Sequence, residues 1–116
     1  MAQEEIFTID QGADVAIEMF IVKKDGNPRN IGSHAFNMKM KRSFNSDSAD
    51  TVDWATIVSD ANAGIMTASL TNTQTDALRK GKYVYDVEMQ YVDSDGDTII
   101  ERVLQGQMIV SPSVTR

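Results

Sequence analysis

Between Lys82 and Tyr91 the sequence alternates strictly between two sets of side chains. The inner set would be Tyr83, Tyr85, Val87, Met89 and Tyr91, and the positions between them are mostly polar. Successive side chains of a β-strand point to opposite faces of its sheet, so a period of two places one set inside and the other in water. The alternation therefore predicts a strand with one buried face.

Other segments repeat this period. Phe36, Met38 and Met40 alternate with polar residues, which predicts a second half-buried strand. Val15 to Val22 is apolar on both faces, as expected of a central strand or of one whose outer face is covered. Thr98 to Val110 is also apolar on both faces, with Ile100, Leu104, Met108 and Val110 on one and Ile99, Val103 and Ile109 on the other. Weaker candidates are Ile6 to Ile9, Trp54 to Val58 and Gly64 to Leu70.

Turn and helix signals separate these runs. Asp-Gly pairs at positions 25–26 and 95–96 supply the positive φ that tight turns need, and the second pair predicts a β-hairpin. Gly106, inside the last run, indicates a bulge or a close backbone approach. One short helix is predicted around Thr73 to Lys80, because Thr71 can cap its first turn while Gln74 reaches back to the cap.

About seven short strands separated by turns predict an all-β fold. The helix before the penultimate strand favours an immunoglobulin-like antiparallel β-sandwich, in which a tyrosine near the start of that strand often hydrogen-bonds across the corner between the sheets. Tyr83 has that place, and Tyr85 stands where disulfide-bonded sandwiches carry their second cysteine. We expect both to be structural. The sequence has no repeat or linker, so residues 1–116 are expected to form a single domain.

Composition excludes several classes of function. The chain has 116 residues, no cysteine and a formal net charge of -6. The lack of cysteine removes disulfides and thiolate chemistry. The negative charge opposes binding to nucleic acid or to an anionic membrane surface. Met1 to Asp10 is acidic and has no basic residue, unlike a secretory signal, so synthesis in the cytoplasm is expected.

The sequence offers no set of residues for catalysis. His34, the single histidine, precedes a predicted strand and is expected to lie in water and not to act as a general base. A zinc site needs several His or Cys ligands. Asp93, Asp95 and Asp97 alternate as calcium ligands can, but the later glycine and glutamate of an EF-hand loop are missing. A solvated turn is favoured over a looser calcium site, and no enzyme activity or cofactor is expected.

Two features indicate protein–protein contacts. Strands that are apolar on both faces need a cover, and the candidate interface residues are Phe20, Val22, Ile99 and Ile109. Lys39 and Lys41 form a basic stripe on the outward face of the Phe36 strand. Such a stripe either discourages edge-to-edge association or meets an acidic patch of a neighbour, such as one bearing Asp86 and Glu88.

Three short sequence motifs resemble those of a known group of proteins. They are Gly81-Lys82-Tyr83-Val84-Tyr85-Asp86, Arg102-Val103-Leu104-Gln105-Gly106 and Ser111-Pro112-Ser113-Val114-Thr115-Arg116. The stretch from Val52 to Arg116 resembles small virion proteins of tailed bacteriophages, and in particular the immunoglobulin-like domain at the start of some phage baseplate proteins. The first half is similar only in its strand pattern.

The resemblance implies a non-enzymatic structural subunit of a phage tail, baseplate or capsid. Such a subunit would lie in the virion, bind other phage structural proteins, and occur as a homo-oligomer or in several copies. The alternative is a module that binds host-surface glycan, or an adhesin, acting through the loop Phe44 to Asp53 with Trp54 beside it. The single tryptophan of a sandwich is more often a core residue, and a hydrolase is the least favoured class.

Overall fold

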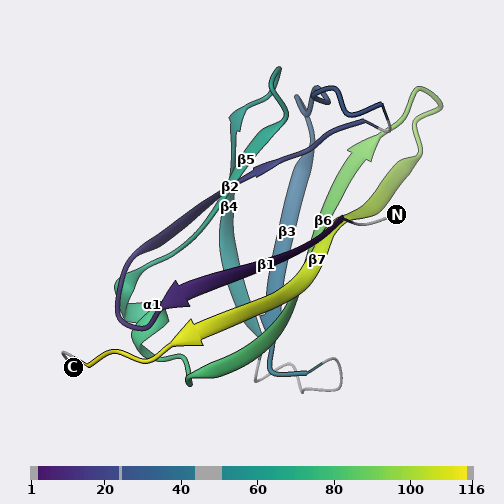
Figure 1. The fold of residues 1–116 in the computed structure, drawn as a ribbon. Coiled ribbons are helices and arrows are strands. Elements are labelled where there is room, and N and C mark those ends of the chain that lie inside the picture. The colour runs from purple at the N-terminus through teal and green to yellow at the C-terminus, as the bar shows by residue number, and fades with distance from the viewer. Residues whose placement is uncertain (1–2, 24, 44–50, 115–116) are drawn as a thin grey trace.

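The computed structural model describes residues 3–23, 25–43 and 51–114. Within these residues the chain forms seven strands and one short helix (Figure 1). The elements are β1 (Gln3–Asp10), β2 (Val15–Phe20), β3 (Ala35–Lys41), β4 (Val52–Asp60), β5 (Ile65–Leu70), α1 (Asn72–Asp76), β6 (Gly81–Val92) and β7 (Thr98–Ser111). The all-β fold predicted from the sequence is confirmed.

The strands lie in the order β1-β7-β6-β3-β4-β5-β2 and fold into two facing layers (Figure 1). Strand β4 takes part in both layers, because Val52–Trp54 pairs with β3 whereas Ala55–Asp60 pairs with β5. The first sheet therefore contains β1, β7, β6, β3 and the start of β4. The second contains the rest of β4 with β5 and β2. The result is an elongated sandwich with extents of 50 × 28 × 22 Å.

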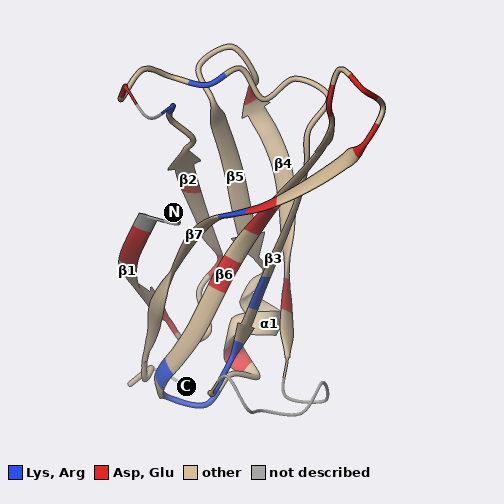
Figure 2. Ribbon diagram, turned by 90° about the vertical axis from the view of Figure 1, so that its right-hand side faces the viewer, with Lys and Arg blue, Asp and Glu red and all other residues tan. Residues whose placement is uncertain are grey.

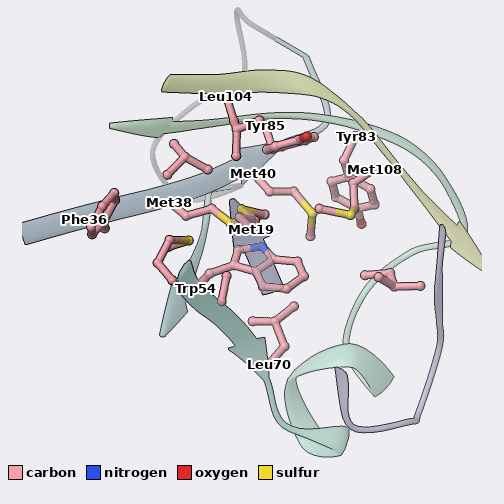
Figure 3. Close-up of a cluster of buried hydrophobic side chains, with 14 of the residues drawn as sticks. Met19, Phe36, Met38, Met40, Trp54, Leu70, Tyr83, Tyr85, Leu104 and Met108 are labelled. Atoms are coloured by element: carbon pink, nitrogen blue, oxygen red, sulfur yellow. The ribbon is translucent and has the colours of Figure 1, made fainter. Parts of the chain in front are cut away.

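The core lies between the two layers and is rich in methionine (Figure 3). The first sheet contributes the inward set of β6, from Tyr83 to Met89, together with alternate residues of β3 and β7. The second sheet contributes Met66, Ala68 and Leu70 of β5, as their alternation predicts. The six methionines buried there are Met19, Met38, Met40, Met66, Met89 and Met108. Their flexible thioethers suit the irregular space around Trp54 and the two tyrosines.

Two sequence predictions for strands are wrong in part. Strand β2 is not central: it lies at the edge of the second sheet and pairs with β5 alone. In β7 the register shifts opposite Val87 and Glu88, so that Val103 is inserted between Leu104 and Arg102. This bulge reverses the alternation. Ile100 therefore leaves the inner face and is 59% exposed.

The helix is shorter than predicted. Thr71 and Gln74 form the predicted capping box, in which Thr71 Oγ1 accepts from the Gln74 amide and Gln74 Oε1 accepts from the Thr71 amide. The helix ends at Asp76 instead of Lys80, because the following residues turn inward and bury Leu78. The connection then crosses to the first sheet and enters β6 at Gly81.

Strand β1 runs parallel to β7 and forms the other edge of the sheet order. Gly106 makes their approach possible, since a Cβ atom there would lie 2.0 Å from the carbonyl oxygen of Glu5. Of the two predictions for Gly106, the close backbone approach is confirmed, and the bulge is at Val103. Among the described residues, β1 and β2 thus each pair with one strand only.

Candidate interaction surfaces

Tyr83 closes the corner between α1 and β6. Its ring is buried, its hydroxyl donates to the carbonyl oxygen of Arg79 at 3.1 Å, and it accepts from the Arg79 amide at 3.0 Å. The Arg42 guanidinium lies 4.9 Å from the ring centroid. One side chain therefore satisfies both backbone groups of Arg79 and ties the crossover to the core.

Tyr85 connects β6 with β1 across β7. It is 3% exposed, and its hydroxyl donates to the carbonyl oxygen of Glu5 at 2.9 Å. Its ring packs against Phe7 with centroids 5.8 Å apart. Burial, with a smaller contribution from the negative charge of Glu5, raises the pKa of Tyr85 far above its usual value. The residue therefore holds β1 in place as a neutral hydrogen-bond donor.

The basic stripe and the acidic patch lie side by side in one molecule (Figure 2). Lys39 of β3 stands opposite Asp86 of β6 in the register, and its Nζ pairs with Asp53 Oδ1 at 3.3 Å. Asp86 in turn pairs with Arg102 at 3.3 Å. Asp53 and Asp86 thus have intramolecular partners. Among the described residues Lys41 has no ion pair, and it lies half-buried near the end of β3.

The predicted apolar interface residues do not form one surface. Phe20 and Val22 are 60% and 45% exposed and line a cleft of about 360 Å³ between β1 and β2, together with Phe7. Ile109 is opposite Lys82 on the outer face of the first sheet. Ile99 stands opposite Tyr91 and is half-buried, because the β7 bulge turns it toward the inner face.

The sequence analysis missed Ile57, an exposed isoleucine on the second sheet. Ile57 of β4 is 66% exposed and stands opposite Thr67 of β5. Its signal was the alternation in β4, where Trp54, Thr56 and Val58 share one face and Ile57 takes the other. Phe20 and Ile65 are opposite each other on the same outer face. The described part of that face, made by alternate residues of β2, β5 and β4, carries little charge.

His34 lies at the loop end of the sandwich in a ring-stacking arrangement. Its ring stacks on Tyr91 at 4.8 Å between centroids, and the Arg29 guanidinium lies 5.0 Å from the centroid of the same tyrosine. Glu101 accepts from the Tyr91 hydroxyl at 2.9 Å and pairs with Arg29 at 3.6 Å. Each group has a structural partner, so this arrangement orders the loop end.

The acidic hairpin between β6 and β7 is organised by Asp93. Its Oδ1 accepts from the amides of Asp95 and Asp97, at 3.0 and 2.9 Å. In residues 3–23, 25–43 and 51–114, no group of three or more His, Asp or Glu side chains is arranged to hold a metal ion.

No helix in the same residues is long and apolar enough to cross a membrane.

Trp54, the residue proposed to contact a glycan, is not available on the surface. Trp54 is 5% exposed and packs in the core, so it cannot offer a face to a sugar (Figure 3). Positions 44–50 of the proposed binding loop lie outside the described residues. The Trp54 Nε1 has no hydrogen-bond partner among the described residues.

A seven-stranded sandwich whose penultimate strand follows a short crossover helix, with a buried tyrosine at the corner, is an immunoglobulin-like fold. The chain has the fold of a phage protein domain, the N-terminal domain of ORF48 of phage TP901-1. The two share 14% sequence identity and a TM-score of 0.62, over 92% of this chain and 85% of that one.

A second solved structure aligns more loosely. It is AggA, the major subunit of aggregative adherence fimbriae type I from Escherichia coli, with 10% identity and a TM-score of 0.39 over 91% of this chain and 89% of that one. A TM-score of that size is too low to indicate a common fold. No protein-family model matches the sequence, and no curated protein matches it.

Proposed function

We propose that this chain is a non-enzymatic structural subunit of a phage tail, baseplate or capsid, and that it acts through protein–protein contacts. The observation that carries the proposal is the fold that it shares with the N-terminal domain of phage TP901-1 ORF48 over 92% of its length. The resemblance of the last half of the sequence to small phage virion proteins supports the same conclusion.

The surface of the sandwich supports an assembly role. Phe20 and Val22 are exposed beside a cleft. Its other lining residues are the apolar Phe7, Met19 and Leu104 and the acidic Glu5 and Glu18. The cleft lies between β1 and β2, and in the part of the chain that the structure describes each of these strands pairs on one side only. A partner that covers this cleft would bury apolar surface, which is the main source of binding free energy between proteins. We propose other phage structural proteins as partners and several copies per particle.

The internal chemistry supports a non-enzymatic role. In the described part of the chain, His34 is engaged with Tyr91, and Arg29, Tyr91 and Glu101 bind one another. None of these contacts joins a serine or threonine hydroxyl to His34, whose Nδ1 lies 2.8 Å from the carbonyl oxygen of Gly32, so they do not form a Ser-His triad. The hydrogen bonds of Tyr83 and Tyr85 likewise connect strands and loops.

The test is incorporation into particles. The variants Phe20→Glu and Ile109→Glu each place a charge on a proposed contact, one at the cleft and one on the outer face of the first sheet. We expect folded protein that is absent from purified virions, measured by circular dichroism and by mass spectrometry of the particles. Ile100→Glu, which changes an isoleucine of 59% exposure outside the proposed contacts, is the matched control. Wild-type protein missing from purified particles would overturn the proposal.

A further inference from the structure

Clusters of like charge lie at the two ends of the molecule (Figure 2), although each end also carries a residue of the opposite sign, Arg29 beside Tyr91 at one and Asp76 of α1 at the other. One end carries five basic residues, named here the basic pole: Lys41, Arg42, Arg79, Lys80 and Lys82. The opposite end carries the hairpin residues Asp93, Asp95 and Asp97, named here the acidic pole. Strand β6 connects the two poles, since Lys82 is its second residue and Asp93 follows its last.

The basic pole is held in a fixed arrangement. Arg42 lies against the Tyr83 ring, and its Nη1 donates to the carbonyl oxygen of Lys80 at 3.1 Å. A hollow of about 420 Å³ opens there, and Arg42, Arg79 and Tyr83 are among its lining residues. Among the described residues none of the five basic side chains has an ion pair. The pole therefore combines a cluster of positively charged residues with a concave surface.

The acidic pole is convex and equally well ordered. The hairpin projects from the end of the sandwich (Figure 1), and Asp93 fixes its shape through the two backbone amides. Asp95 and Asp97 are exposed at the tip. No ion pair joins these three carboxylates to another described residue. The carboxylates are therefore positioned to contact a basic hollow.

The two poles cannot neutralise each other within one molecule. A strand rises about 3.3 Å per residue, so the length of β6 separates them by about 36 Å. This distance is several times the Debye length of about 8 Å at physiological ionic strength. Of the acids on the outer face between them, Asp53 and Asp86 are paired with Lys39 and Arg102, and Glu88 stands opposite Arg102 in the register. Only a second molecule can bring the poles into contact.

We infer that the acidic hairpin of one copy docks on the basic pole of the next copy, so that the chain associates head to tail. The inference rests on the proposed assembly function and names one partner for it, a second copy of this chain. Because the two contacting surfaces differ, the interface is heterologous and generates a ring or a filament instead of a two-fold dimer.

Charge-reversal variants test the inference on purified protein. The first variant, Arg79→Glu/Lys80→Glu/Lys82→Glu, makes the basic pole acidic. The second, Asp95→Lys/Asp97→Lys, makes the acidic pole basic and keeps Asp93 to hold the turn. We expect wild type to associate in sedimentation velocity at about 50 mM salt and to dissociate at about 500 mM, where screening is much stronger. Each variant alone should lose at least about tenfold in association constant, since both of its poles then have one sign.

The decisive sample is an equimolar mixture of the two variants. Each acidic pole then faces a basic one on the other variant, so association should return to about the wild-type level. Arg79→Lys/Lys80→Arg/Lys82→Arg keeps the charge and should associate like wild type, and circular dichroism checks the fold of every variant. A monomeric wild type at low salt, or a mixture that stays monomeric, would overturn the inference. Either result leaves the proposed function standing if the protein is found in particles.

Discussion

Gly106 lies where the backbones of β1 and β7 are closest. Its φ of 154° is in the region that favours glycine, and the position of a Cβ atom would be 2.0 Å from Glu5 O and 3.0 Å from Glu5 C. Both of these are backbone atoms of β1, which cannot rotate away as a side chain can. The hydrogen of glycine is therefore the only side chain that permits this pairing.

Gly106→Ala should destabilise the protein by about 3 kcal/mol, because the added methyl overlaps β1 and the backbone angle becomes strained. Urea unfolding gives the free energy, and hydrogen exchange should show loss of protection in β1. Gly96→Ala is the matched control: its φ of 84° is also positive, but no atom lies within 4 Å of the added methyl. Equal losses in the two variants would show that the contact with β1 is unimportant.

Tyr83 should matter for stability, because its ring is buried and its hydroxyl binds both backbone groups of Arg79. Tyr83→Ala removes a buried aromatic ring at a cost of about 3 to 5 kcal/mol in the free energy of unfolding. Tyr83→Phe keeps the ring and loses the hydrogen bonds with Arg79, at a cost of about 1 kcal/mol. Chemical denaturation measures both. Wild-type stability in Tyr83→Ala would reject the role of the corner.

Tyr85 should make the protein sensitive to alkali. Its pKa is raised in the folded state, so the protonated tyrosine contributes stability that is fully present below the unfolded pKa of about 10 and is lost as the pH rises further. The thermal midpoint of wild type should therefore fall more steeply above pH ~10 than that of Tyr85→Phe. Because other groups titrate in both proteins, the difference between the two curves is the relevant quantity. Parallel curves would contradict this prediction.

At the scale of elements, the β6–β7 hairpin is stabilised by hydrogen bonds within its own turn, two of them accepted by the Asp93 side chain. Asp93 Oδ1 accepts from two amides of the turn, and the Asp93 amide donates to the carbonyl oxygen of Asp97 at 2.9 Å. These bonds close the turn without a cation. They explain why alternating aspartates, which resemble a calcium motif in sequence, can have a purely structural role.

Calcium should not bind appreciably to this hairpin, because calcium takes six to eight oxygen ligands and an oxygen of Asp93 is already engaged. Titration calorimetry should give no heat of binding at physiological concentrations. Asp93→Ala should lower stability equally with and without calcium. A micromolar site that disappears in Asp95→Ala would prove this prediction wrong.

The elements predicted best were those whose signals are local. The alternation around Tyr85 fixed the inward face of β6, and Thr71 with Gln74 located the start of α1, because strand faces and helix caps depend on residues a few positions apart. The β7 bulge was not predicted at Val103, and it changed the orientation of Ile99 and Ile100. The position of a one-residue insertion depends on how β6 pairs with β7. The alternation of residues within β7 alone does not indicate that pairing.

The same limit applies to the candidate surfaces. The sequence identified Phe20 and Val22 as apolar residues without a partner, and both are exposed. It did not predict that β2 is an edge strand, because the pairing of β2 depends on the route of the whole chain. It considered contact of Lys39 with an acidic patch of a neighbour as one alternative, but not that the register sets Lys39 opposite Asp86 in the same sheet.

For the molecule as a whole, the rate at which the buried methionines are oxidised measures how readily the core opens. Six methionine side chains are at most 3% exposed, so peroxide should reach them only after unfolding. We expect mass spectrometry to find them unmodified in folded protein and oxidised in urea. Conversion of Met38 or Met108 in folded protein at the rate seen in urea would mean that the core opens readily.

The parallel pairing of β1 with β7 also determines when the fold can be completed. Gln3 pairs with Leu104, so the partner of the first strand is encoded about one hundred residues later. At a synthesis rate of about 5 to 20 residues per second, β1 waits on the order of 5 to 20 s for β7 to be made. During that interval Ile6, Phe7 and Ile9 lack the neighbour that orders them. Of the strands in this sheet, the one made first therefore joins it among the last, and its apolar side chains are exposed until then.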